Sequence, residues 1–79
     1  MNNILKENAD KIHTTEMGAE RIRRNLGLYD IDAAACCKEK ILQADAVIER
    51  KGKNWYVHTD ECVITVNAGS YTIITCHRK

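Results

Sequence analysis

The sequence has 79 residues and a mass of 9.0 kDa, which suffices for one small domain over residues 1–79 and not for two. Hydrophobic residues make up 44% and charged residues 29%, and proline is absent, so the composition is globular rather than disordered or fibrous. The formal charge of +1 excludes strong whole-surface attraction to nucleic acid or membrane, and the small core leaves little room for an enclosed active site.

The N-terminal half of the sequence has a helical pattern. Apolar residues recur at offsets of three and four within 2–12, which predicts a short amphipathic helix. Thr14 or Thr15 is expected to cap a second helix, and Gly27 to end it, because glycine accepts the left-handed backbone. The apolar stripe expected on this helix consists of Met17, Ala19 or Glu20, Ile22 and Leu26.

A third helix is expected to begin after Asp30 or Asp32, either of which can act as its N-cap. Its expected apolar face consists of Ala33, Ala34, Cys36, Cys37, Ile41 and Leu42. Its solvent-facing side is expected to carry Lys38, Glu39 and Lys40. The run of alanines predicts close packing of this helix, for example against a sheet.

From Ala46 onward the hydrophobic period changes to two, and β-branched and aromatic residues dominate. Strands are expected at 46–50, 55–58, 62–66 and 71–76. The short connections force antiparallel neighbours. The predicted fold class is therefore α+β: two to three N-terminal helices (about 2–45) packed on one face of a four-stranded antiparallel meander (about 46–78).

The register of the last hairpin has two solutions. A two-residue turn at Ala68-Gly69 places Val66 opposite Tyr71 and Ile64 opposite Ile73. It also gathers Asn67, Ser70, Thr65 and Thr72 on the other face. A three-residue loop would instead place Cys62 opposite Cys76. We favour the two-residue turn, and a slip of one residue would reverse the two faces.

Four cysteines raise the question of a disulfide framework or a zinc site. Cys36 and Cys37 are adjacent and point about 100° apart on a helix, and Cys62 and Cys76 stand alone, so no ligand pair has the usual zinc spacing. We expect the four cysteines to be small buried hydrophobic residues that stay reduced, and we expect the protein to bind neither a metal nor a cofactor. The N-terminus lacks the pattern of a signal peptide and no apolar run could span a membrane, which predicts a cytoplasmic protein without membrane contact.

Two clusters of polar residues could carry chemistry. Lys51 and Lys53 lie at a predicted hairpin tip beside Trp55 and Tyr56, where cations could bind phosphate and aromatic rings could stack on bases. A charged hairpin tip with Trp55 in the core explains the same residues without function. The residues from 46 to 79 carry a net charge of +2 (five basic, three acidic) and residues 1–45 carry −1 (seven basic, eight acidic), so the cations gather in the strand half.

The second cluster lies at the C-terminus, where His77 and Arg78 follow a strand that bears Thr72 and Thr75. Histidine moves protons near neutral pH, and a cation can stabilise the phosphate during RNA cleavage, in which the RNA 2′-hydroxyl is the nucleophile. A frayed basic tail is the alternative interpretation.

The segments Gly52-Lys53-Asn54-Trp55-Tyr56-Val57, Ile64-Thr65-Val66-Asn67 and Ser70-Tyr71-Thr72-Ile73-Ile74-Thr75, with the terminal His77, resemble a family of short bacterial proteins. That family is known only as domain of unknown function 3781, and the resemblance extends over nearly the whole chain. The strand half is also similar to metal-independent ribonuclease toxins of the barnase–colicin–RelE-like group, which place helices before an antiparallel sheet.

The likeness to the toxins implies catalytic roles for His77, Thr72 and Ser70, and nucleic-acid binding by Lys51, Lys53, Asn67 and Arg78. The near-neutral charge departs from the basic character of such toxins. The preferred hypothesis is a binding module with a polar sheet face, whose partner is RNA or a protein. The alternatives are a metal-independent ribonuclease and a homodimer formed through a free strand edge.

Overall fold

The computed structural model describes residues 4–28 and 30–79, in which helices precede a four-stranded antiparallel sheet. The helical elements are α1 (Ile4–Glu7), the 3-10 turn η1 (Ala9–Lys11), α2 (Glu16–Leu26) and α3 (Ala33–Ile41). The strands are β1 (Val47–Lys51), β2 (Asn54–His58), β3 (Cys62–Asn67) and β4 (Ile73–Arg78), in the spatial order β1-β2-β3-β4. The predicted α+β class and the meander are confirmed.

The helix ends follow local chemistry. The hydroxyl of Thr15 accepts a hydrogen bond from the Gly18 amide at 3.0 Å, which caps α2, and Gly27 ends that helix with φ of 68°. The carboxylate of Asp32 accepts from the Ala35 amide at 3.2 Å and caps α3. One predicted cap of each pair is therefore confirmed. The predicted helix over 2–12 is divided into α1 and η1, and its expected start at residue 2 lies outside the described residues.

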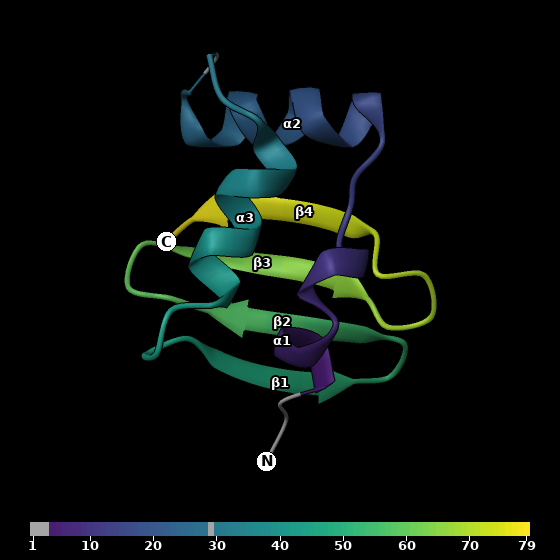
Figure 1. Ribbon diagram of the computed structural model, residues 1–79. Coiled ribbons are helices and arrows are strands. Elements are labelled where there is room, and N and C mark those ends of the chain that lie inside the picture. The colour runs from purple at the N-terminus through teal and green to yellow at the C-terminus, as the bar shows by residue number, and fades with distance from the viewer. Residues whose placement is uncertain (1–3, 29) are drawn as a thin grey trace.

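The helices cover one face of the sheet. Figure 1 shows α1 and α3 crossing in front of the strands and α2 running along the β4 edge. Between these layers lies the core, whose buried members among residues 4–28 and 30–79 are Leu5, Ile12, Ile22, Leu26, Ala33, Cys37, Ile41, Trp55, Val57, Cys62, Ile64, Val66, Ile73 and Cys76. Trp55 belongs to this core, as the structural interpretation of that residue predicted, and its ring lies 5.3 Å from that of Tyr71.

One residue expected on the apolar face of the second helix and one expected on that of the third are exposed instead. Met17 is 74% exposed because it lies in the first turn of α2, on the side away from the sheet. Leu42 is 51% exposed because α3 ends at Ile41, and the chain turns away before the next residue could reach the core.

Both predicted registers of the last hairpin are wrong. Val66 pairs with Ile73, Ile64 with Cys76 and Cys62 with Arg78, because Ile74 is an extra residue in a β-bulge. The connection between the two strands contains the five residues 68–72, and Tyr71 within it has a positive φ of 61°. The bulge restores the alternation that buries both Ile73 and Cys76, so burial of the core side chains determines the register.

Candidate nucleic-acid interface

The face of the sheet opposite the helices is open, and the strand register assigns its residues to three rows. Residues directly opposite one another in an antiparallel sheet share a face. The amide row consists of Lys51, Asn54 and Asn67, the hydroxyl row of Glu49, Tyr56, Thr65 and Thr75, and the histidine row of Val47, His58, Val63 and His77. The residues between them, such as Trp55 and Val57, point into the core. The rows together form the open face.

The amide row lies at the end of the sheet next to the last loop. The side-chain oxygen of Asn67 accepts hydrogen bonds from the Gly69 amide at 2.9 Å, the Ser70 amide at 3.0 Å and the Ser70 hydroxyl at 3.2 Å. These three donors hold the loop and fix which end of the Asn67 amide is oxygen. Asn67 Nδ2 then lies 3.5 Å from Oδ1 of Asn54.

A hydroxyl and imidazole cluster extends the amide row beyond the loop. Ser70 Oγ lies 2.8 Å from Thr72 Oγ1, which lies 3.1 Å from Nε2 of His13. The other ring nitrogen of His13 lies 2.8 Å from the carbonyl oxygen of Lys11. A carbonyl only accepts, so Nδ1 donates to it. In the neutral ring Nε2 can then only accept, and because the Ser70 hydroxyl donates to Asn67, the single hydrogen of the Thr72 hydroxyl can go to either His13 or Ser70.

The hydroxyl row crosses the middle of the open face. Tyr56 lies between Glu49 on β1 and Thr65 on β3, and Thr65 faces Thr75 on β4. Tyr56 and Thr75 are half-buried, while Thr65 is 9% exposed because its neighbours on both sides shield it. The row places one half-buried aromatic ring on the open face, between the carboxylate of Glu49 and the hydroxyl of Thr65.

The histidine row places two imidazoles on one face with a single strand between them. His58 and His77 both lie directly opposite Val63, from β2 and β4 respectively. With a strand spacing of about 4.8 Å, their Cα atoms lie about 10 Å apart. The carboxylate of Glu49 lies 3.4 Å from Nε2 of His58, so it forms an ion pair with that ring when the ring is protonated.

The residues predicted to be catalytic do not all lie together in the structure. Ser70 and Thr72 contact each other, but His77 lies at the opposite end of the β3–β4 pair, opposite Val63. His13 is the histidine that contacts Thr72. Sequence reasoning could not join residues 13 and 72, because no local pattern signals a contact between segments so far apart.

The residues predicted to bind nucleic acid are also spread out. Lys51 and Asn67 belong to the amide row, and Lys53 lies in the adjoining β1–β2 turn, where its carbonyl accepts from the Ala68 amide at 2.7 Å. Arg78 points to the helix side, where its guanidinium donates to the carbonyl of Leu26. Arg50 also lies on that side, with its guanidinium 5.5 Å from the Trp55 ring.

His58 was missed although its signal is in the sequence. It follows Asn54 and Tyr56 at intervals of two, and these positions alternate with the buried Trp55 and Val57. Period-two alternation therefore predicts that all three polar residues share the open face.

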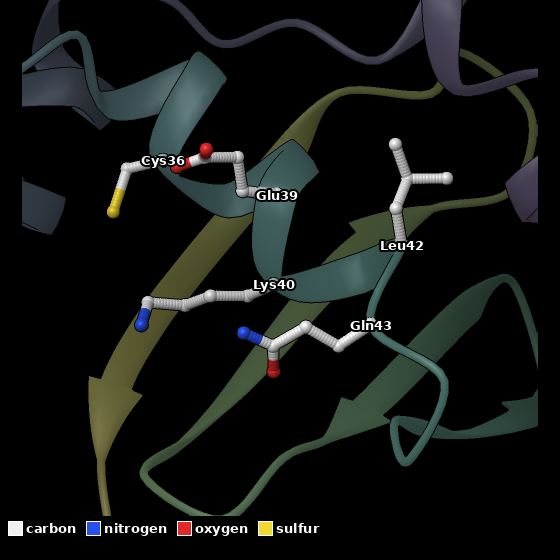
Figure 2. A pocket seen from close by; sticks show the side chains of 5 residues that line it. All are labelled: Cys36, Glu39, Lys40, Leu42 and Gln43. Carbon is white, nitrogen blue, oxygen red and sulfur yellow. The ribbon is translucent and has the colours of Figure 1, made fainter.

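The helix side has a hollow that is separate from the open face. Figure 2 shows it beside α3, lined by Cys36, Glu39, Lys40, Leu42 and Gln43. Lys40 reaches Glu61 at 3.1 Å, and this hydrogen bond raises the pKa of Lys40. Burial raises the pKa of the Cys36 thiol, so the reactive thiolate is scarce there. The hollow thus combines a paired cation with an unreactive thiol.

The four cysteines are free thiols, and Cys37, Cys62 and Cys76 are buried in the core, which confirms the prediction of small buried hydrophobes for these three. Cys36 is half-buried. Within residues 4–28 and 30–79, no group of three or more His, Cys, Asp or Glu side chains is arranged to hold a metal ion. In the same part of the chain, every helix is too short or too polar to cross a membrane.

Comparison with known proteins gives one result. A family model described as "Protein of unknown function (DUF3781)" matches residues 6–77, nearly the whole chain. No curated protein and no solved structure matches the sequence. The similarity to ribonuclease toxins therefore remains a prediction from the sequence.

Proposed function

We propose that this chain, which belongs to the DUF3781 family, binds single-stranded RNA on the open face of its sheet. The observation that carries the proposal is the hydroxyl row, which places Tyr56 at the centre of an accessible face. Single-stranded RNA exposes the planes of its bases, and aromatic rings on an antiparallel sheet stack on them.

The surroundings of Tyr56 suit RNA. The Thr75 hydroxyl in the same row and the side-chain amides of Asn54 and Asn67 in the neighbouring amide row can hydrogen-bond to base edges and to the 2′-hydroxyl. Lys51 and Lys53 lie at one end of the face, where they can contact phosphates. Because the cations are few, we expect weak binding with a shallow dependence on salt.

Fluorescence anisotropy with a labelled single-stranded RNA tests the proposal, with single-stranded DNA of the same sequence and duplex RNA as matched probes. We expect saturable binding of the single-stranded RNA, weaker binding of the DNA and none of the duplex, whose bases are stacked inside. Absence of saturable RNA binding at low salt would refute the proposal.

A second candidate function, metal-independent RNA cleavage, is favoured by the histidine row. One imidazole would take the proton of the 2′-hydroxyl as that oxygen attacks phosphorus, and the other would give a proton to the departing 5′-oxygen. The products are a 2′,3′-cyclic phosphate and a 5′-hydroxyl end. His58 and His77 lie on the same face, with the strand that carries Val63 between them.

Incubation with total tRNA tests this second function. We expect cleavage by the wild type, loss of cleavage in His58→Ala and in His77→Ala, and slower cleavage in Lys53→Ala. Intact tRNA with every protein would refute cleavage, while leaving the binding proposal to its own test. Light scattering of the same samples tests the homodimer hypothesis, which predicts a measured molecular mass near twice 9.0 kDa.

A further inference from the structure

We infer that the amide row selects guanine, by donating hydrogen bonds to its O6 and N7 atoms. The inference rests on the proposed binding of single-stranded RNA and adds the base that the face prefers. It follows from the orientation of two asparagine side chains, which the hydrogen bonds of the last loop determine.

The first step is the orientation of Asn67. Its Oδ1 atom accepts from the Gly69 amide, the Ser70 amide and the Ser70 hydroxyl, at 2.9, 3.0 and 3.2 Å. An NH2 group in that place would face three donors, so the amide is held with its nitrogen away from the loop. The oxygen is thereby occupied, and Asn67 presents only donor hydrogens to a ligand.

The second step is the orientation of Asn54 on the neighbouring strand, which follows from that of Asn67. Asn67 Nδ2 lies 3.5 Å from Oδ1 of Asn54, so Asn54 is held with its oxygen toward Asn67. Among the described residues, no protein group accepts a hydrogen bond from Asn54 Nδ2, and its two hydrogens remain for a ligand. The two amides thus form a chain in which each dipole points the same way, an arrangement that strengthens its terminal donors.

The third step adds Lys51, which lies directly opposite Asn54 and contributes a further donor. A ligand on the amide row therefore meets donors from three adjacent strands and must present acceptors. Guanine presents two adjacent acceptors, O6 and N7, on an edge without donors. Adenine places its N6 amino group beside N7, and cytosine places its N4 amino group beside N3, so each would set a donor against a donor.

The test uses short labelled RNAs of uridine with one central position occupied by guanosine, adenosine, cytidine, uridine or 7-deazaguanosine. We expect the guanosine probe to bind about tenfold more tightly than the adenosine and cytidine probes, as a bidentate contact to one base allows. The 7-deazaguanosine probe, which lacks only the N7 acceptor, should lose most of that advantage.

The matched variant is Asn67→Asp, which keeps an oxygen for the loop donors and replaces the outward NH2 with a second oxygen. We expect the guanosine preference to vanish, and Asn54→Asp to have the same effect should the first variant melt at a lower temperature. Gln43→Glu adds the same charge on the exposed helix side and should leave the preference unchanged.

The outcomes separate the two proposals. Failure of every probe to bind the wild type refutes RNA binding and the base preference with it. Equal binding of all probes refutes the guanine preference alone. A guanosine preference that survives both asparagine variants, in proteins with wild-type circular dichroism, assigns the selection to other residues and also overturns the inference.

Discussion

The imidazole of His13 and the hydroxyl of Thr72 meet at 3.1 Å, although 59 positions separate them in the chain. Two backbone hydrogen bonds accompany this contact, from the His13 amide to the Tyr71 carbonyl at 3.1 Å and from the Ile73 amide to the His13 carbonyl at 2.7 Å. The segment before α2 thus pairs with the start of β4. It holds the loop that orients Asn67, so it supports the amide row from outside the sheet.

The His13–Thr72 contact predicts a measurable loss of stability in Thr72→Val. The substitution keeps the shape and the backbone pairing but removes the hydroxyl that contacts both His13 and Ser70, so the free energy of unfolding should fall by about 0.5–1.5 kcal/mol for each hydrogen bond lost. Urea unfolding measures it. Thr75→Val, on the open face, is the control, and an equal effect of both substitutions would show that the contact contributes nothing particular.

Tyr56 is predicted to provide the stacking surface for RNA. Tyr56→Ala should weaken binding of the single-stranded probe by about 1–3 kcal/mol per stacked base, while Tyr56→Phe, which keeps the ring, should bind nearly as the wild type does. Anisotropy titrations of the two variants measure the difference. Unchanged affinity in the alanine variant would place the RNA elsewhere.

The cations at the end of the amide row predict the salt dependence of binding. Each phosphate contact contributes about −0.7 to the slope of log affinity against log salt for single strands. Lys51→Ala and Lys53→Ala should each make the slope shallower by about that amount, because each removes one contact. Lys38→Ala on α3 serves as the control, and a slope that changes equally in all three variants would contradict this account.

The buried thiols predict a loss of stability in alkaline solution. Burial raises the pKa of Cys62 above its ordinary value of 9.0, and a hydrogen bond from the Cys76 thiol to Cys37, together with burial, raises the pKa of Cys76. Unfolding exposes thiols that ionise near pH 9.0, whereas the folded thiols keep their protons. The stability they contribute is therefore complete below that pH and decreases as the pH rises above it.

Urea unfolding on both sides of pH 9.0 measures this effect. The decrease should be smaller in Cys76→Ala, which lacks one of the buried thiols, than in the wild type. Cys36→Ala is the comparison, since Cys36 is only half-buried and should change the pH dependence less. An identical pH dependence in wild type and Cys76→Ala would exclude the thiol as its source.

Much of the fold was predictable because its determinants are local. Thr15, Gly27 and Asp32 define helix ends through contacts within three or four residues, and the change of period at residue 46 marks the start of the sheet. The hairpin register was not predictable in this way. It depends on the bulge at Ile74 and on a loop closed by the Asn67 side chain, neither of which appears in the hydrophobic pattern.

In the candidate site, too, the parts set by local sequence pattern were predictable and the parts set by tertiary structure were not. Alternation along β2 is sufficient to place Asn54, Tyr56 and His58 on one face. The separation of His77 from Thr72 required the register. The contact of His13 with Thr72 required the tertiary structure, because it joins the two ends of the chain.

Ultraviolet crosslinking of a single-stranded RNA that contains 5-iodouridine tests the central claim most directly, since this base forms bonds with aromatic side chains that stack on it. Tandem mass spectrometry then identifies the crosslinked residue. The open face as the RNA-binding surface predicts a crosslink at Tyr56 on β2, and its loss in Tyr56→Ala. Crosslinks confined to α2 or α3, or none in a complex shown by anisotropy to be saturated, would contradict it.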